Sequence, residues 1–323
     1  MAKKVALLIV GGGPIGLACA LAAQQQGLDY VVIEKGCLVN SLYRYPVNMT
    51  FFSTSERLEI GGIPFVSNNA KPTRPEALEY YRRVAVSKHV NIQLFEKAET
   101  IKPAQEGYTV ITDKAVYEAS NIVIATGFYD IPNLLRIPGE DLPKVTHYYK
   151  DPHFYATRKV IVVGANNSSV DAALETYRKG ADVTMVIREG EIGKRVKYWV
   201  KPDIENRIKE SSIKAYFHSS LVGIREQEAD ILTPEGIITI PNDFVIAATG
   251  YQPDFHFLEN TGIQLSADGA REPVYNEDTM ETNMPGIYLA GVVCGGMNTH
   301  VWFIENSREH ADKIIRHIAA KTK

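Results

Sequence analysis

The sequence predicts an α/β protein of two domains, and three observations support this fold class. Near the N-terminus, a strand pattern, a glycine-rich turn, a helix pattern and a second strand pattern form a β-α-β unit. Another copy of this unit begins at residue 159, in the middle of the chain. The chain has 323 residues, which is more than one compact core usually holds. We therefore predict two Rossmann-like dinucleotide-binding domains with three ββα layers each, the second inserted into the first.

The first unit begins with VALLIV (5–10), an apolar run that predicts a buried strand. The turn GGGPIG (11–16) follows, and LACALAAQQQG then predicts a helix that ends at Gly27. The β-rich run YVVIEKG (30–36) completes the unit. The N-terminal lysines and apolar run superficially resemble a secretory signal peptide. However, four glycines and a proline within residues 11–16 would break a targeting helix.

The second unit consists of the strand KVIVVG (159–164), the predicted helix ANNSSVDAALETYRKG and the strand ADVTMVIREG. Two further segments support a duplication. NIVIATGFYDIP (121–132) and DFVIAATGYQPD (243–254) are both apolar strands that end in Ala-Thr-Gly and continue with an aromatic residue. Each Ala-Thr-Gly turn is therefore expected to close one unit.

The domain boundaries follow from the segments around these units. Residues 137–159 are rich in proline and aromatic residues, which is typical of a crossing between domains. A late strand, TNMPGIYLAGVV (282–293), resembles neither copy, so we expect it to return to the first domain. We predict a discontinuous first domain of residues 1–152 and 255–323, with residues 153–254 as the inserted second domain.

Composition and charge exclude several classes of function. The chain has 35 basic and 38 acidic residues and a net charge of -3. It therefore lacks the excess of basic residues that binding to nucleic acid or to an anionic membrane requires. No uninterrupted apolar run reaches the roughly 18 residues of a transmembrane helix. Cys19, Cys37 and Cys294 form no CxxC pair, so neither a disulfide scaffold nor a zinc site is indicated. We expect a cytoplasmic homo-oligomer that binds small molecules or other proteins.

The glycine turn of the first unit has the pattern of a dinucleotide site. Gly11 makes the tight turn, Gly13 lets the backbone approach a pyrophosphate, and Gly16 permits close packing of helix on strand. Glu34 ends the next strand 23 residues after Gly11, where an acid accepts hydrogen bonds from ribose hydroxyls. The cofactor-binding residues predicted here are Gly11, Gly13, Pro14, Ile15, Gly16, Glu34 and Lys35.

The corresponding turn of the second unit is degraded. Gly164 is kept, but Asn166 and Ser169 occupy the second and third glycine positions. Arg188 stands where the first unit has its acid, and arginine pairs with a 2'-phosphate, so this site is predicted to prefer NADPH over NADH. An exposed charge at a strand end is the alternative reading of Arg188. The residues predicted to bind NADPH are Gly164, Asn166, Asn167, Ser168, Ser169, Arg188, Lys197 and Gly250.

Two dinucleotide sites in one chain are typical of electron transfer, in which one site holds a flavin and the other receives a nicotinamide cofactor. The acidic first site is therefore predicted to hold FAD. GGGPIG, VVIEK, the paired Ala-Thr-Gly turns and the late AGVV together resemble the low-molecular-weight thioredoxin-reductase-like flavoproteins, over essentially the whole chain.

More narrowly, several segments resemble the bacillithiol-disulfide reductase family: EKGCLVNSLYRYPVNMTFFSTSERLEIG (34–61), NNSSVDAALE (166–175), NDFVIAATGYQPD (242–254) and FIENSREH (303–310). This resemblance implies an enzyme that uses FAD and NADPH to reduce a small-molecule disulfide. By matching motifs, it also implies flavin contacts at Ser41, Asn48, Thr126, Gly127, Gly291 and Val292.

The cysteines depart from these patterns. No CxxC lies in the second unit, and Ile15 stands where such reductases often have a cysteine in the turn. Cys294 follows AGVV, which the resemblance places near the flavin ring, so it is the candidate catalytic residue. Its alternative role is that of a small side chain packed under the flavin.

Three other functions remain open at the level of sequence. A ferredoxin or flavodoxin reductase needs no cysteine, because a flavin passes single electrons. A flavin monooxygenase also pairs two nucleotide sites. A non-enzymatic NADPH sensor would bind both cofactors with negligible turnover.

Overall fold

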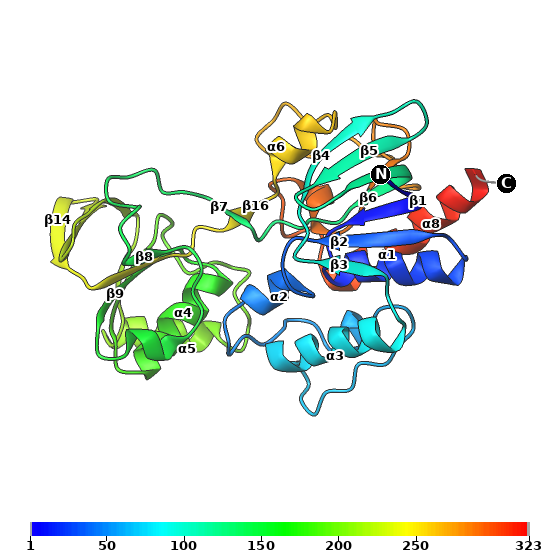
Figure 1. Cartoon of the computed structure of the whole chain (residues 1–323). Helices are drawn as coiled ribbons and strands as arrows, with labels where there is room; N and C mark the ends of the chain where they lie inside the picture. The colour runs from blue at the N-terminus through cyan, green and yellow to red at the C-terminus, as the bar shows by residue number, and fades with distance from the viewer. Residues whose placement is uncertain (1, 322–323) are drawn as a thin grey trace. The chain divides into compact units, whose positions relative to one another are not determined.

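The computed structural model describes residues 2–321 and has the predicted α/β fold. Within these residues the chain forms two compact units (Figure 1). Unit 1 consists of Met1–Arg44, Met49–Ile131 and Tyr251–Lys323, and unit 2 of Tyr45–Asn48 and Pro132–Gly250. The middle of the chain is therefore inserted between two parts of unit 1, as expected.

Unit 1 is built on a mixed sheet in the order β3-β2-β1-β6-β5-β4, with β17 also paired to β6. The inner strands are parallel, and Leu7, Leu8 and Ile9 of β1 are fully buried because both faces of the sheet are covered. The strands are β1 (Lys3–Val10), β2 (Tyr30–Glu34), β3 (Ile92–Leu94), β4 (Ala98–Pro103), β5 (Tyr108–Thr112), β6 (Val116–Ile124) and β17 (Ile287–Leu289).

Two helices cover one face of this sheet and pack on each other: α1 (Pro14–Gln25) and α8 (Glu309–Lys321). Proline at the first position of α1 suits a helix start, because it has no N–H to satisfy there. The helix α3 (Arg74–Ser87) begins with a capping box formed by Thr73 and Glu76. Shorter helices of this unit are α2 (Asn40–Arg44), η1 (Glu56–Leu58), α6 (Phe255–Asn260), η3 (Val292–Gly295) and α7 (Ile304–Ser307).

Unit 2 has a parallel sheet in the order β11-β10-β9-β15-β8 and a separate antiparallel sheet in the order β12-β13-β14. Helices α4 (Asn167–Arg178) and α5 (Lys201–Lys209) belong to it, together with η2 (Pro152–Tyr155). The strands are β8 (Val145–Thr146), β9 (Lys159–Val163), β10 (Asp182–Val186), β11 (Lys214–Tyr216), β12 (Ser220–Ile224), β13 (Glu228–Thr233), β14 (Gly236–Pro241) and β15 (Phe244–Ala247).

The core of unit 2 shows the alternation expected of strands covered on both faces. Val160 and Val162 of β9 pack with residues of α4 and α5, whereas Ile161 and Val163 pack with the antiparallel sheet. Helices, parallel sheet and antiparallel sheet therefore form three layers, and the predicted ββα arrangement is confirmed in this unit.

The unit boundaries differ from the predicted ones. Unit 2 begins at Pro132 instead of residue 153 and ends at Gly250 instead of residue 254. The reason is that Leu135, Ile137 and Leu142 pack on the core of unit 2, and β8 pairs with β15. The chain passes from one unit to the other at β7 (Ile131–Pro132) and β16 (Tyr251–Gln252), which pair as a two-stranded sheet.

No helix within residues 2–321 is both long enough and apolar enough to cross a membrane. Over the same residues, no group of three His, Cys, Asp or Glu side chains could hold a metal ion.

Candidate functional site

In unit 1, the predicted motifs meet at the carboxyl ends of neighbouring parallel strands. The Gly11 N–H donates to Ile33 O at 2.8 Å, the Ala125 N–H to Val10 O at 2.8 Å, and the Ala290 N–H to Ile124 O at 3.0 Å. The glycine turn, the first Ala-Thr-Gly turn and the AGVV segment thus lie side by side. Ligands of open α/β sheets bind at this edge.

The three motif glycines have different reasons to be glycine. Gly11 has φ +109°, and a Cβ on it would overlap Ala125 O. A Cβ on Gly16 would overlap Gly11 O, so both residues are required by packing within the protein. No described atom lies within 4 Å of a Cβ built on Gly13. The space beside Gly13 is therefore open. A pyrophosphate needs such space to approach the backbone, so the turn fits a dinucleotide.

Glu34 is buried, with 7% of its surface exposed, and it holds the glycine turn in place. One carboxylate oxygen accepts from the Gly12 N–H at 2.8 Å and the other from the Gly36 N–H at 2.8 Å. Burial raises the pKa of Glu34, and these two hydrogen bonds oppose that rise. Each oxygen keeps a further lone pair, so the acid can still accept a hydrogen bond from a ligand.

The neighbouring Lys35 has a partner within the protein. Its ammonium group lies 2.8 Å from the carboxylate of Asp130, which also pairs with Arg44 at 3.4 Å. Lys35 is therefore part of an ion-pair network, a role that the sequence prediction did not include.

The remaining predicted flavin residues divide into two groups. A Cβ on Gly291 would lie 3.4 Å from Ile15, and a Cβ on Gly127 would lie 4.0 Å from Val292, so these four residues converge, with Thr126 beside Gly127. Ser41 lies in α2. Asn48 differs from expectation, because it belongs to unit 2 and its amide donates to Glu175 at 3.4 Å.

Cys294, the predicted catalytic residue, does not have the environment of an activated thiolate. Its side chain is 1% exposed, and burial raises the pKa of its thiol. The Sγ lies 3.8 Å from Nδ1 of His310, whose own pKa is lowered to about 4 by burial. Both groups are neutral near pH 7, so they do not form a thiolate–imidazolium pair. Sequence reasoning missed His310 because 19 residues separate it from Gly291, its partner.

In unit 2, the second glycine turn repeats the geometry of the first. The Gly164 N–H donates to Val186 O at 3.0 Å, and the Ala248 N–H donates to Val163 O at 3.1 Å. Gly164 has φ +122°, and a Cβ on it would lie 2.8 Å from Ala248 O. Gly250, with φ +87°, accepts from the Asn133 N–H at 2.9 Å.

The polar residues at the start of α4 have unequal exposure. Asn166 and Ser168 are exposed, whereas Ser169 is buried and donates to Asn166 O at 2.8 Å. The Asn167 amide donates to Arg195 O at 3.1 Å and accepts from the Lys197 N–H at 2.9 Å. Asn167 therefore fixes the 195–197 loop beside the start of the helix.

Arg188 and Lys197, the two predicted phosphate ligands, differ in their surroundings. The Arg188 side chain is 80% exposed and its nearest acid, Glu189, is 4.0 Å away, so its guanidinium group is accessible. Lys197 is 8% exposed, and its ammonium group pairs with Asp171 at 2.7 Å. Asp171 already pairs with the ammonium group of Lys197, and the binding of phosphate by Lys197 stays a prediction.

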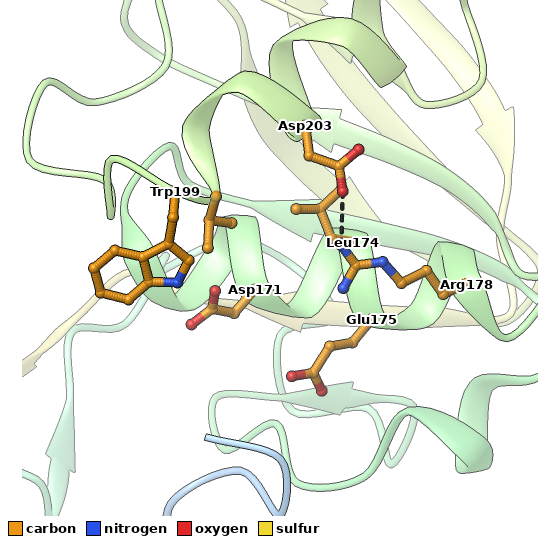
Figure 2. A pocket seen from close by; sticks show the side chains of 7 residues that line it. Asp171, Leu174, Glu175, Arg178, Trp199 and Asp203 are labelled. Atoms are coloured by element: carbon orange, nitrogen blue, oxygen red, sulfur yellow. Dashed lines mark hydrogen bonds and ion pairs between the residues drawn. The ribbon is translucent and has the colours of Figure 1, made fainter. Parts of the chain in front are cut away.

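A cavity of about 250 Å³ lies elsewhere in unit 2, along α4 and the segment that leads into α5 (Figure 2). Its charged groups are paired: Arg178 with Asp203 at 2.6 Å, and Glu175 with the Tyr149 hydroxyl at 2.7 Å. The residues that line it are Asp171, Leu174, Glu175, Arg178, Trp199, Val200 and Asp203. It does not include the predicted nucleotide residues at the start of α4.

Two parallel-sheet units, each with a glycine turn at the strand ends, define a two-domain oxidoreductase architecture that binds dinucleotides. The family model described as "Pyridine nucleotide-disulphide oxidoreductase" matches residues 8–291, and the chain belongs to this family of enzymes. The family uses a flavin and a pyridine nucleotide.

Individual relatives narrow the comparison. "Bacilliredoxin reductase Bdr" from Bacillus subtilis (strain 168) is 45% identical over 316 residues, which cover 97% of each chain. The solved structure named "Bacillithiol Disulfide Reductase Bdr (YpdA)" from Bacillus cereus has a TM-score of 0.96 and 43% identity, and the match covers 99% of this chain and 100% of that one. A ferredoxin–NADP reductase from Ignicoccus hospitalis is 27% identical, over 88% of each chain. The family predicted from the sequence motifs is confirmed.

Proposed function

We propose that this protein is an FAD enzyme that uses NADPH to reduce a small-molecule disulfide of the bacillithiol disulfide class. The observation that carries the proposal is the 43% identity, over 99% of this chain, to the Bacillus cereus protein named as a bacillithiol disulfide reductase. Overall, NADPH, one proton and the disulfide give NADP⁺ and two thiols. Bound FAD supplies the chemistry of accepting a hydride from NADPH and passing two electrons to the disulfide.

We assign FAD to unit 1. Gly11, Gly13 and Gly16 bring the backbone and the start of α1 close to the pyrophosphate, and Glu34 accepts hydrogen bonds from the adenosine ribose. The convergence of Ile15, Gly127, Gly291 and Val292 supports this assignment. The side chains among them, those of Ile15 and Val292, are apolar.

We assign NADPH to unit 2. The exposed guanidinium group of Arg188 holds the 2'-phosphate through charge-assisted hydrogen bonds, and Asn166 and Ser168 donate to the pyrophosphate. These three residues are exposed and lie in the segments that follow the parallel strands β9 and β10, which supports the assignment. An acid at the position of Arg188 would instead favour NADH.

Among the described residues 2–321, neither Ile15 nor Cys294 supplies an activated thiol near the predicted flavin ring. Ile15 is apolar, and the Cys294 thiol is buried with its pKa raised. We therefore propose that the disulfide is reduced without a thiol relay through either position. This distinguishes the enzyme from reductases that form a mixed disulfide with a protein cysteine.

We further propose that the enzyme works in the cytoplasm as a homo-oligomer. Three cysteines with no disulfide between them support a reducing compartment. Light scattering of the purified protein tests the assembly, and a molar mass equal to one chain of 35.9 kDa would contradict it.

The test of function is NADPH oxidation by the purified protein, followed with bacillithiol disulfide, glutathione disulfide, ferredoxin and no acceptor. We expect bacillithiol disulfide to accelerate NADPH oxidation well above the rate without acceptor and above the rate with glutathione disulfide. Faster turnover with ferredoxin than with either disulfide would contradict the proposal and favour an electron-transfer reductase.

A further inference from the structure

His310 is a buried polar side chain that the proposed mechanism does not use. It lies in the first turn of α8 and is 2% exposed. Its Nδ1 accepts a hydrogen bond from the Gly291 N–H at 3.2 Å, and Sγ of Cys294 lies 3.8 Å from the same nitrogen. The ring packs edge-on against Trp302, with 4.5 Å between the ring centroids. Because Nδ1 is the acceptor, the proton of the neutral ring is on Nε2.

This hydrogen bond links His310 to the candidate cofactor site, because its donor, Gly291, is one of the predicted flavin contacts. It has φ +88°, and Ile15 lies 3.4 Å from the position of its missing Cβ, so the turn has little room to shift. Leaving the buried Gly291 N–H without an acceptor would be costly. His310 is therefore the group that keeps Gly291 in this conformation beside the start of α1.

The surroundings argue against proton transfer by His310. The groups near it are Cys294 from η3, Lys313 from its own helix and, next to Cys294, Cys19 from α1. The two thiols are buried and have raised pKa values. Neither thiol is therefore a ready partner for proton transfer with His310.

We propose that His310 is a positioning residue that fixes the turn from Gly291 to Cys294 and thereby shapes the wall against which the flavin binds. This inference rests on the proposed function, because it takes unit 1 to hold FAD. His310 acts through the Gly291 N–H and does not itself contact substrate.

Two substitutions of equal polarity test this role. In His310→Asn, the side-chain Oδ1 takes the place of Nδ1 and can accept from Gly291, whereas in His310→Gln the polar atoms fall near the place of Nε2. We expect His310→Gln to weaken FAD binding by the apoprotein about tenfold or more and to shift the visible flavin spectrum. His310→Asn should bind FAD within about threefold of the wild type and keep its spectrum.

Equal FAD affinities and spectra for the two variants would overturn the proposal, because they would show that only packing matters. If neither variant folds, the tautomer of the wild-type ring decides. Long-range ¹H–¹⁵N correlation spectra of histidine-labelled protein should show the Nε2–H tautomer, and an Nδ1–H tautomer would overturn the proposal. If the wild-type protein binds no FAD, the proposed function fails, while the tautomer measurement still tests the hydrogen bond to Gly291.

Discussion

Among single residues, the most informative are three predicted site residues whose side chains contact partners within the protein. Cys294, Lys197 and Asn48 all stand in motifs with a chemical interpretation. Each is held by a partner distant in the sequence: His310, Asp171 and Glu175 respectively. A sequence motif gives the residue type at a position. The group that this side chain contacts depends on how the chain folds.

Substitution of Cys294 should have little effect on turnover. Because the thiol is buried and its pKa is raised, it is a poor nucleophile, and Cys294→Ala should keep kcat/KM for the disulfide within about threefold of the wild type. Steady-state kinetics with bacillithiol disulfide, together with stopped-flow reduction of the flavin by NADPH, measures this. Loss of disulfide turnover with normal flavin reduction would show that Cys294 takes part in catalysis.

Arg188 should determine the choice between the two nicotinamide cofactors. Removing its exposed guanidinium in Arg188→Ala loses charge-assisted bonds to the 2'-phosphate, so KM for NADPH should rise about 10- to 100-fold while KM for NADH changes little. Lys194→Ala is the matched control, since Lys194 is 84% exposed and pairs with Glu191 in the same loop region. Equal effects of the two substitutions on KM for NADPH would contradict the assignment.

At the scale of elements, the strand–turn–helix units were predictable and their stabilising partners were not. The first strand, turn and helix can be predicted from about 20 residues, VALLIV, GGGPIG and the helical segment after them. Such a short stretch suffices because apolar periodicity and turn-forming residues are local features. The anchoring of the AGVV turn by α8 depends on a hydrogen bond between residues 291 and 310, and no local pattern indicates it.

Substitutions of Gly13 and Gly16 should affect different properties: the first should weaken FAD binding, and the second should lower stability. Gly16→Ala places a Cβ against Gly11 O, so it should lower the free energy of unfolding by about 2 kcal/mol or more. Gly13→Ala meets no described atom, so the apoprotein should keep its stability but bind FAD at least about tenfold more weakly. Thermal unfolding of both apoproteins and their FAD titrations measure this contrast. Wild-type FAD affinity in a stable Gly13→Ala protein would argue against the pyrophosphate assignment.

The anchoring of α8 by neutral His310 should make stability depend on pH. Its pKa falls from 6.5 to about 4 on folding because the charged ring is disfavoured when buried. The stabilisation is therefore complete above about pH 6.5 and is lost as the pH falls through the folded-state pKa. The loss reaches about 3 kcal/mol by pH 4. Denaturant unfolding between pH 7 and pH 4 should show a smaller loss for His310→Asn than for the wild type. Substitution of the exposed His153 by Asn is the control and should leave the wild-type pH dependence unchanged.

For the molecule as a whole, the insertion of one unit into the other follows the prediction. The start of the inserted unit lies at Pro132, whereas residue 153 was predicted. Residues 137–159 are rich in proline and aromatic residues, so the sequence predicted the crossing between domains there. In the structure, Val145 and Thr146 pair with β15, and nearby apolar residues complete the core of unit 2. A strand of two residues leaves no periodic signal, and only its partner in the sheet identifies it.

In the proposed reaction, one chain carries two electrons from NADPH to a small disulfide. The most direct test is the ratio of thiol formed to NADPH consumed by the purified FAD-loaded protein under anaerobic conditions, with bacillithiol disulfide as sole acceptor. The proposed function predicts two thiols for each NADPH oxidised, and a rate that the Cys294→Ala variant retains. NADPH oxidation without thiol formation, or no oxidation at all with this acceptor, would contradict it.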